Sequence, residues 1–497
     1  MRTRSTSSPT PGPGVLESAT APRQGSVAPP LVTVVIVNWN GAHLLPDCLD
    51  ALAAQDLPDG QLAVWVVDNA SRDGSRELLA RDYPWVKVLA NPRNDGFAGG
   101  NNVALRQVET PFVALLNNDA RPAPDWLARL LEPFSAPGSE RLAAATAKVV
   151  FLPRFVALRL SMPGFVPGGL DPRELGARVY QVTVDGLDVT EYVLWDQVAY
   201  GPEGEGDGRF RWVRPAGTLL VPVDQHGGGA GPGWRGAGSL QRASAANQIR
   251  LGLRLAAEAA KPVEVAWEGA AATVKATQEV ADAEVVLPAG VALVDVLNNA
   301  GSKVFSDGYG ADRAYQEPDR GQYERAEEVF TFCGAAVCFR TEALREAGFF
   351  DDDFFLYYED TDLAWRLRAL GWSISYQPGA VVRHIHSASS KEWSPLFTFH
   401  VDRNRLLMLT KNASARLALR EVLRYPLTTA SLALREAARA RHTRRRPPLR
   451  PTLLRLRVCV SYLRLLPAML ARRRDLARRA RVGRGQLERW LVPRPGP

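Results

Sequence analysis

The chain has 497 residues, 46% of them apolar and 23% charged, which predicts two to four folded domains and excludes wholesale disorder. Its formal net charge of +8 is unevenly spread. Residues 415–497 hold 22 arginines, no lysine and four acids, a net of +18, whereas residues 1–414 carry −10. Four scattered cysteines exclude a disulfide framework, and no apolar run of about 20 residues or secretory signal is visible, which favours a cytoplasmic location.

The first half of the chain alternates between strand-like and helix-like segments. Residues 1–30 are rich in Pro, Ser, Thr and Gly and are predicted to be disordered. Strands are then expected at 31–41, 62–68, 86–90 and 112–116, with helices at 43–55, 74–81 and 97–108. This order predicts an α/β fold with a doubly wound, mostly parallel sheet. Ligands bind such sheets beyond the carboxyl ends of the strands, where the polar clusters Asn38-Trp39-Asn40, Asp68-Asn69 and Asn117-Asn118-Asp119 lie.

A β-rich insertion is predicted at 151–300, between a first half of the sheet domain at 31–150 and a second half at 301–411. Its β-branched stretches suggest a β-sandwich, and they lie at 178–184, 210–221, 263–267 and 283–287. Residues 249–260 fit either a strand or a helix. Core packing is expected for Trp195, Trp212 and Trp234, with stacking on sugar rings as the alternative. Beyond the insertion we expect a helix at 341–347 and a short strand at 373–377.

Three polar clusters could carry chemistry. Asp68 and Asn69 could bind a base or ribose, or simply form a turn and a helix cap. The carboxylate of Asp119 could bind a nucleotide-bound cation, and capping of a loop is the alternative. Glu359, Asp360 and Asp362 in FFDDDFFLYYEDTDLAWRLRALGW head an apparent helix, where an apolar setting raises a carboxyl pKa toward that of a general base.

Two histidines, His384 and His386, lie two residues apart after the short strand. They could ligate a metal ion of the Mn²⁺ type or could be structural.

Taken in order, VIVNWNG, VVDNASRDGS, NPRNDGFAGGNN, LLNNDA, GAAVCFR and the acidic aromatic run resemble the inverting GT-A glycosyltransferases of family 2. The rhamnosyltransferase-like and galactofuranosyltransferase-like members are the most similar, over residues 32–150 and 329–411. The resemblance implies a GT-A nucleotide-diphospho-sugar transferase fold. It also implies transfer from a nucleotide-diphosphate sugar, with dTDP-rhamnose or a UDP-sugar favoured, to a glycan or polyprenyl-linked acceptor in cell-envelope polysaccharide synthesis.

The resemblance also assigns residues. It implies a nucleotide-sugar-binding set of Asn38, Asn40, Asp68, Asn69, Asn94 and Asn117. Asp119 would hold Mg²⁺ or Mn²⁺ on the donor diphosphate, although Asn117 replaces the first acid of the usual DxD motif. His384 would complete the metal site, with His386 as the fallback. Asp360 resembles the catalytic base, and Glu359 would help to position the acceptor.

The tail at 412–497 is predicted to be helical and basic. Apolar residues recur in it at steps of three and four, namely Leu453, Leu456, Val460, Leu463, Leu466 and Leu470. We interpret the tail as an interfacial helix on an anionic membrane, which would make the protein peripheral on the inner face of the cell membrane. A helical bundle packed on the catalytic domain is the alternative. A nucleic-acid partner is not expected, because no binding motif is present.

The sequence leaves two rival functions open. A sugar nucleotidyltransferase would need a Gly-rich phosphate loop after the first strand, which WNGAHLLPDC does not provide. A non-catalytic glycan-binding protein would not need the series of acidic and amide motifs.

Overall fold

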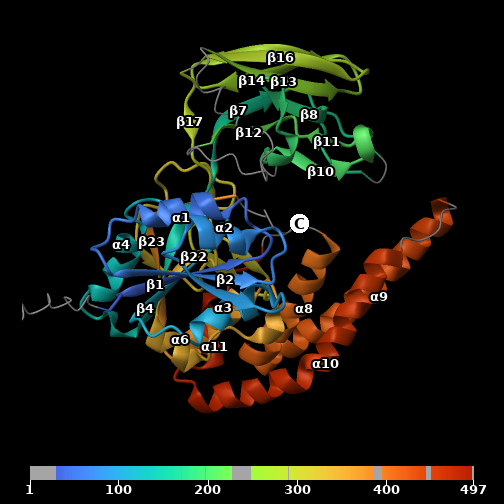
Figure 1. Ribbon diagram of the computed structural model, residues 1–497. Helices are drawn as coiled ribbons and strands as arrows, with labels where there is room; N and C mark the ends of the chain where they lie inside the picture. The colour runs from blue at the N-terminus through green and yellow to red at the C-terminus, as the bar shows by residue number, and fades with distance from the viewer. Residues whose placement is uncertain are drawn as a thin grey trace, which may run out of the picture.

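The computed structural model describes residues 29–168, 171–195, 198–225, 248–288, 290–385, 394–443 and 449–494. An α/β unit, a β-sandwich and a set of C-terminal helices follow one another along the chain, with the sandwich above the α/β unit in Figure 1. Trp234, His386 and residues 1–28 lie outside the described residues. None of the described helices combines the length and the apolarity needed to cross a membrane.

The α/β unit is built on a ten-stranded sheet with the order β21-β23-β6-β22-β4-β1-β2-β3, with β18 beside β6 and β5 beside β23. Its first strands are parallel, and their residues alternate between the two faces. These strands are β1 (Val32–Asn38), β2 (Leu62–Asn69), β3 (Lys87–Asn91) and β4 (Phe112–Leu116). The prediction of an α/β fold with a parallel sheet in the first half of the chain is confirmed.

Helices cover both faces of the sheet. One face packs against α1 (Leu45–Ala53), α2 (Ser75–Asp82) and α4 (Trp126–Leu131). The other packs against α3 (Gly96–Leu105), α6 (Thr341–Ala347) and α7 (Glu359–Ala369). Figure 1 shows α1 and α2 on one side of β1 and β2, with α3 and α6 on the other.

Strands from the second half of the chain complete the sheet. β22 (Ala336–Arg340) runs antiparallel between β4 and β6 (Leu142–Phe151), and β23 (Ser373–His384) lies parallel to β6. The edge is finished by β5 (Ala120–Pro122), β18 (Leu297–Asn299) and β21 (Glu327–Glu328). The strand predicted at 373–377 is therefore longer than expected, because β23 continues through a bulge to His384.

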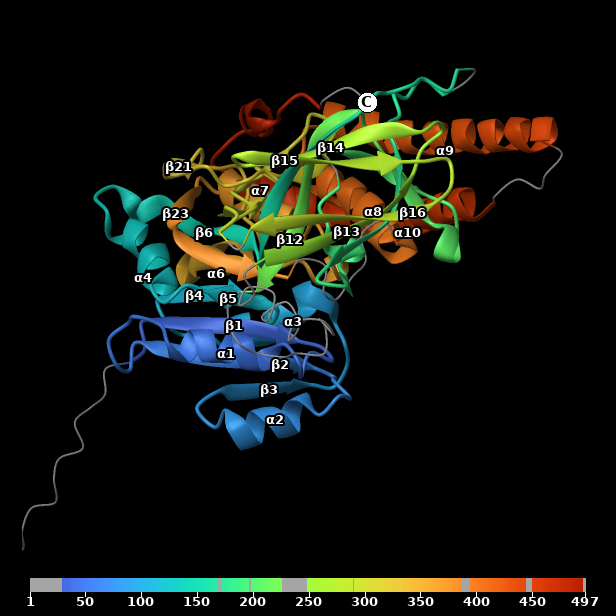
Figure 2. The same ribbon diagram turned by 90° about the horizontal axis from the view of Figure 1, so that it is seen from above.

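Two antiparallel sheets form the β-sandwich between β6 and β18, and Figure 2 shows their strands from above. One contains β8 (Arg178–Val184), β9 (Leu187–Asp188), β10 (Ala199–Glu203), β11 (Phe210–Val213), β13 (Gln248–Ala256) and β16 (Ala281–Pro288). The other contains β7 (Pro153–Ser161), β12 (Ala216–Gln225), β14 (Lys261–Trp267), β15 (Ala270–Ala276) and β17 (Leu293–Val294).

The sandwich resolves several sequence-based expectations. The ambiguous segment 249–260 is largely strand β13. The stretch 210–221 was expected as one strand but forms two, because β11 and β12 join different sheets. Trp195 and Trp212 are 5% and 7% exposed, so both rings belong to the packing and offer no open stacking face.

Three long helices lie near the C-terminal end of the described residues: α8 (Pro395–Asn412), α9 (Ala415–Thr443) and α10 (Leu449–Arg479). They are followed by α11 (Arg484–Leu487). α8 begins with a Ser394 cap that accepts a hydrogen bond from the Phe397 amide, and it packs against both α7 and α10. The small sheet of β19 (Ser302–Val304) and β20 (Gly310–Asp312) lies in the segment between the sandwich and β21.

Candidate active site

The amide side chains after β1 and β4 meet at the carboxyl ends of these neighbouring parallel strands. Asn38 is fully buried, and its Oδ1 accepts a hydrogen bond of 2.8 Å from Asn118 Nδ2. Its Nδ2 donates to Ser71 Oγ at 3.3 Å, and the Asn40 amide donates to the same oxygen at 2.9 Å. Gly41 leaves room for this contact, since a Cβ there would collide with both amide groups. The buried Asn38 side chain therefore connects the loops after β1, β2 and β4.

Asp68 lies at the end of β2 with 1% of its surface exposed. Its Oδ2 accepts from the Ser71 amide at 3.4 Å and lies 3.6 Å from Arg76 Nε. Its Oδ1 has no hydrogen-bond partner among the described residues. A buried carboxylate oxygen without a partner is costly, so this atom is suited to a hydroxyl or N–H group of a ligand.

Asn69 and Asn94 form a second amide network behind the first. Asn69 Nδ2 donates to Asn94 Oδ1 at 2.9 Å and to the Gly96 carbonyl at 3.0 Å, while Asn69 Oδ1 accepts from Asn91 Nδ2 at 2.8 Å. Asn94 Oδ1 also accepts from the Gly96 amide. These contacts hold the start of α3, so the side chain of Asn69 is occupied within the protein.

Asp119 and His384 lie together at the end of β4 and β23. His384 Nε2 is 3.1 Å from Asp119 Oδ1 and 3.2 Å from Asn117 Nδ2, and the Asp119 and His384 residues are 8% and 7% exposed. Antiparallel pairing of β5 with β23 causes this meeting, since Ala120 pairs with His384. Burial opposes the charged imidazolium, but the carboxylate of Asp119 outweighs it and raises the pKa of His384.

The Asp119–His384 pair fits a divalent cation. A carboxylate oxygen and an imidazole nitrogen are both ligands of Mn²⁺-type ions, and here they already point at one another. Within the described ranges, no group of three or more His, Cys, Asp or Glu side chains gathers as a metal cage. Two protein ligands are nevertheless what a cation bound largely through substrate phosphates requires.

A strained turn places Asp360 at the start of α7. Tyr357 and Tyr358 have φ values of 68° and 70°, which bulky residues rarely adopt. The turn is held from three sides. Asn404 Nδ2 donates to the carbonyls of Leu356 and Tyr357 at 2.9 and 2.7 Å, the Phe97 amide donates to the Phe355 carbonyl at 2.8 Å, and the Gly310 amide donates to the Tyr358 hydroxyl at 3.0 Å.

Asp360 and Glu359 are carboxyl groups in an apolar setting. Burial raises the pKa of Asp360 to about 6, although hydrogen bonds from the Thr361 amide and hydroxyl lower it. Burial and the neighbouring charge of Asp360 raise the pKa of Glu359 well above its usual value. Glu359 Oε2 has no partner among the described residues. Near neutral pH, Asp360 is therefore a carboxylate able to take up a proton.

Asp362, the third acid of the cluster, has a different role. It is completely buried, and its carboxylate receives hydrogen bonds from Lys411 Nζ at 2.8 Å, Arg366 Nε at 2.9 Å and Asn412 Nδ2 at 2.8 Å. Burial alone would raise its pKa, but these cations lower it. Asp362 is thus an anchor for α7.

One short segment joins the two halves of the site. The Ala335 carbonyl accepts a hydrogen bond of 3.0 Å from the Asn117 amide. The preceding amide, of Gly334, donates to Asp360. Asp360 of α7 and Asn117 after β4 are therefore both hydrogen-bonded to the two-residue segment Gly334-Ala335.

Sequence reasoning missed Asp312 at the end of β20. Its carboxylate accepts hydrogen bonds from Asn299 Nδ2 at 2.5 Å and Ser302 Oγ at 3.2 Å. Its negative charge raises the pKa of both Asp360 and His384, so it lies within electrostatic range of both. No motif marked it, because GYGAD carries a single acid in a segment without periodicity. Ser71 could have been found, since it lies inside VVDNASRDGS.

Comparison with known proteins accounts for this arrangement. The model for glycosyl transferase family 2 matches residues 33–149, and that for glycosyl transferase family group 2 matches residues 275–403. The first range contains Asn38, Asp68 and Asp119, and the second contains Asp360 and His384. Two separate regions of the chain therefore match models of glycosyltransferase family 2. The two matched regions meet at the Asn117–Ala335 hydrogen bond.

Individual relatives match only part of this chain. "Glycosyltransferase AglE" of Haloferax volcanii is 30% identical over 112 residues, which cover 22% of this chain and 37% of that protein. "Teichoic acid poly(glycerol phosphate) polymerase" of Staphylococcus epidermidis is 28% identical over 108 residues, or 21% of this chain and 15% of that protein. The chain therefore spans less than two fifths of either relative. The crystal structure of GalNAc-T7 with UDP, GalNAc and Mn²⁺ overlaps 77% of this chain and 48% of that one at 11% identity, with a TM-score of 0.41.

Proposed function

We propose that this chain is an inverting glycosyltransferase that moves a sugar from a nucleotide-diphosphate donor to a glycan or polyprenyl-linked acceptor in cell-envelope polysaccharide synthesis. The observation that carries the proposal is the position of Asp360, a carboxyl group with a pKa of about 6 at the same sheet edge as the Asp119–His384 pair. The relative named for teichoic acid synthesis supports the cell-envelope context. We propose dTDP-rhamnose or a UDP-sugar as the donor.

Asp360 is the proposed general base. It removes the proton from an acceptor hydroxyl while that oxygen bonds to the anomeric carbon, and the bond from that carbon to the diphosphate oxygen breaks with its electron pair leaving on the nucleotide. Attack opposite the leaving group inverts the configuration. Glu359, buried beside Asp360, would hold the acceptor in place.

No enzyme nucleophile is needed for this route, and the thiol near Asp360 is unsuited to the role. Burial raises the pKa of Cys333, with a smaller contribution from the charge of Asp312, so the thiol stays protonated. A single displacement is therefore the favoured reaction.

The donor would lie along the carboxyl ends of β1, β2 and β4. The free Oδ1 of Asp68 is suited to the nucleoside, and the loop around Asn38 and Asn40 would form the wall beside it. Asp119 and His384 would hold Mg²⁺ or Mn²⁺ near the diphosphate. The ion, when bound, supplies positive charge that stabilises the leaving nucleoside diphosphate.

The experiment measures sugar transfer and hydrolysis across a panel of nucleotide sugars with Mn²⁺ or Mg²⁺. For the preferred donor, Asp360→Asn should lower turnover at least 1000-fold and leave the dissociation constant of the nucleoside diphosphate within threefold. Asp282→Asn, on the exposed strand β16, is the matched control and should retain full activity. Full turnover by Asp360→Asn, or a product with retained anomeric configuration, would contradict the mechanism.

A further inference from the structure

The outer side of α10 carries a continuous apolar row. Its residues follow one another at steps of three, four or seven along the helix, and each is between 38% and 61% exposed: Leu449, Leu453, Leu456, Val460, Leu463 and Leu470. From Leu449 to Leu470 the row is about 32 Å long at 1.5 Å per residue. Single exposed leucines are common on protein surfaces, but a row of this length on one side of a helix is typical of a surface that binds an apolar partner.

The opposite side of α10 is firmly packed, so the orientation of the helix is fixed. Val458, Tyr462 and Met469 are buried against the rest of the protein, and Tyr462 shares a hydrogen bond of 2.9 Å with Thr410 of α8. Arg473 donates to the carbonyls at the end of α8. One side of α10 is therefore packed on the rest of the protein. Of the predicted apolar stripe, Leu466 is partly buried against the core, and the other five residues face outward.

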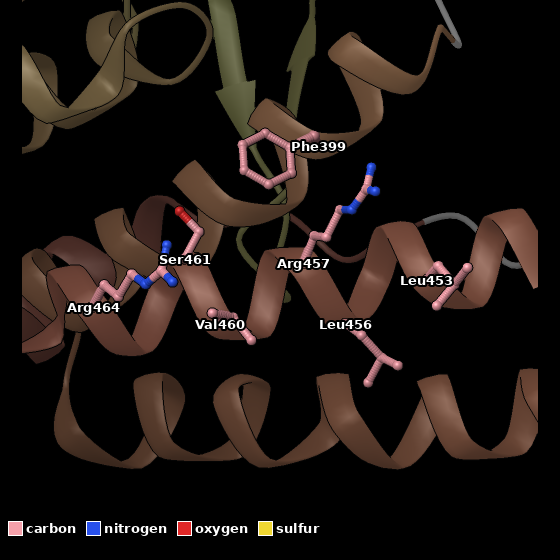
Figure 3. A pocket seen from close by; sticks show the side chains of 7 residues that line it. All are labelled: Phe399, Leu453, Leu456, Arg457, Val460, Ser461 and Arg464. Atoms are coloured by element: carbon pink, nitrogen blue, oxygen red, sulfur yellow. The ribbon is translucent and has the colours of Figure 1, made fainter.

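A row of arginines borders the apolar row. Arg450, Arg457 and Arg464 recur every seven residues, and none of them has an ion pair or hydrogen bond with another described residue. Figure 3 shows Arg457 and Arg464 on the side of α10 toward Phe399, with Leu456 and Val460 on the other side. Together these side chains line a groove of about 500 Å³.

The neighbouring helix α9 repeats the pattern. Leu419, Leu423, Leu427 and Leu434 are 55–72% exposed, whereas Glu421 and Tyr425 on its inner side are buried. The two helices lie side by side through hydrogen bonds from Arg455 to Thr428 and Thr429. The exposed leucines thus belong to a helical pair, which Figure 2 shows extending to one side of the molecule.

We propose that the outer face of α9 and α10 docks on an anionic lipid bilayer, with the leucines among the acyl chains and Arg450, Arg457 and Arg464 at the lipid phosphates. Apolar residues beside unpaired arginines match such a surface in both chemistry and charge. A second copy of this chain matches less well, because two α10 helices would bring unpaired arginine rows together with only Asp475 as an acid in each.

The location of the face suits the lipid-linked acceptor of the proposed function, on which this part of the proposal rests. Phe399, which lines the groove, is on α8 beside His400, and His400 stacks on Phe355 at 5.4 Å between ring centroids. Phe397 of the same helix contacts Tyr357, three residues before Asp360. The same helix therefore borders both the lipid-facing groove and the turn that carries the base.

The test compares two triple variants of the full chain, L456Q/V460Q/L463Q and R450Q/R457Q/R464Q, in vesicle flotation. Controls of equal size are V166Q/V280Q/V286Q and R209Q/R254Q/R320Q, all at exposed positions outside the helical pair. The wild type and both controls should bind vesicles of phosphatidylcholine with 40% phosphatidylglycerol and not pure phosphatidylcholine. Each α10 variant should bind at least tenfold more weakly.

Absence of wild-type binding to the anionic vesicles, or equal binding by the leucine variant, would overturn the proposal. The proposal would also be overturned if light scattering showed that the wild type is a dimer and the leucine variant a monomer, while both bound the vesicles equally. Circular dichroism checks that each variant folds. Donor hydrolysis in the absence of vesicles should be unchanged in all four variants, so loss of membrane docking and failure of the proposed catalysis are separate results.

Discussion

Lys411 Nζ lies 2.8 Å from Asp362 Oδ2 in the interior of the protein. Asp362 is only two residues after Asp360 on α7. The cations lower the pKa of Asp362, whereas burial raises that of Asp360 to about 6. Lys411 also contacts Asp351 at 2.6 Å, and Arg472 of α10 lies 2.8 Å from that same Asp351. A chain of ion pairs, from the partly exposed Arg472 to the buried Asp351, Lys411 and Asp362, thus connects the outer helix to the helix that carries the proposed base.

Lys411→Met should destabilise the protein by about 3 kcal/mol, because it leaves two buried carboxylates short of a partner. The figure is at the lower end of the range for broken buried pairs, since Arg366 and Arg472 remain. Urea unfolding at pH 7 measures the loss. The matched control Lys275→Met, on an exposed position of β15, should change stability by less than about 0.5 kcal/mol.

The contribution of Asp362 to stability should also depend on pH with a defined sign. A carboxyl whose pKa is lower in the folded state contributes stability above its unfolded pKa of about 3.9, and this stability is lost as the pH falls through the lowered folded value. The difference in unfolding free energy between wild type and Asp362→Asn should therefore be largest near neutral pH and shrink below pH 4. An equal difference at pH 7 and pH 3 would contradict this role for Asp362.

The rate of transfer should fall on the acid side with a midpoint near pH 6, because Asp360 must be ionised to accept a proton. Asp312 contributes to that value through its negative charge. Asp312→Asn should therefore move the acid limb of kcat/KM to lower pH, by up to about one unit, whereas Asp282→Asn should not. A limb that stays in place in Asp312→Asn would show that another group controls it.

Neutralising the acids of the site should stabilise the fold. Glu359 and Asp360 have raised pKa values, so their ionisation opposes folding at any pH above their unfolded values. Glu359→Gln and Asp360→Asn should each raise the melting temperature at pH 8, and the gain should vanish near pH 4, where the wild-type groups are protonated. Differential scanning calorimetry at the two pH values measures this. A lower melting temperature at pH 8 would show a structural role for the carboxylate.

Metal binding should depend on both members of the pair after β4 and β23. Asp119→Asn and His384→Gln should each weaken Mn²⁺ binding in the presence of a nucleoside diphosphate at least 30-fold, as followed by electron paramagnetic resonance. Asn117→Asp should strengthen it, because Asn117 Nδ2 lies 3.2 Å from His384 Nε2 and a carboxylate there adds a ligand. Unchanged Mn²⁺ affinity in Asp119→Asn would remove Asp119 from the proposed site.

Much of the first half of the site was predictable from local sequence. β1 and β2 are short apolar runs that end in Asn or Asp, and Asn117-Asn118-Asp119 directly follow β4. Parallel strands bring such ends to one edge of the sheet, so Asn38, Asp68 and Asp119 could be placed there.

The remaining features depend on contacts between distant segments. Asp312 lies near Asp360 because the chain returns to the α/β unit after the sandwich and forms β20 there. The local pattern of apolar residues cannot predict such a contact between distant segments. The tail shows the same limit in another way. Its most regular apolar row turned out to be the exposed one, because the less regular set around Val458 and Tyr462 packs inward. Periodicity identified an amphipathic helix but not which partner each side meets.

The strained turn before α7 gives a last prediction. Asn404 donates both of its amide hydrogens, to the carbonyls of Leu356 and Tyr357. The next two φ angles of the turn, at Tyr357 and Tyr358, are positive and cost about 1–3 kcal/mol per residue. Asn404→Leu fills similar volume but makes neither hydrogen bond, so the turn should relax and Asp360 should lose its position. We expect kcat to fall at least 30-fold while the affinity for the nucleoside diphosphate, bound at the other half of the site, changes less than threefold. Asn412→Leu is the matched control on the same helix, because its amide contacts Asp362 and not the turn; it should lower stability more than kcat. Equal losses of kcat in the two variants would mean that the turn does not position the base.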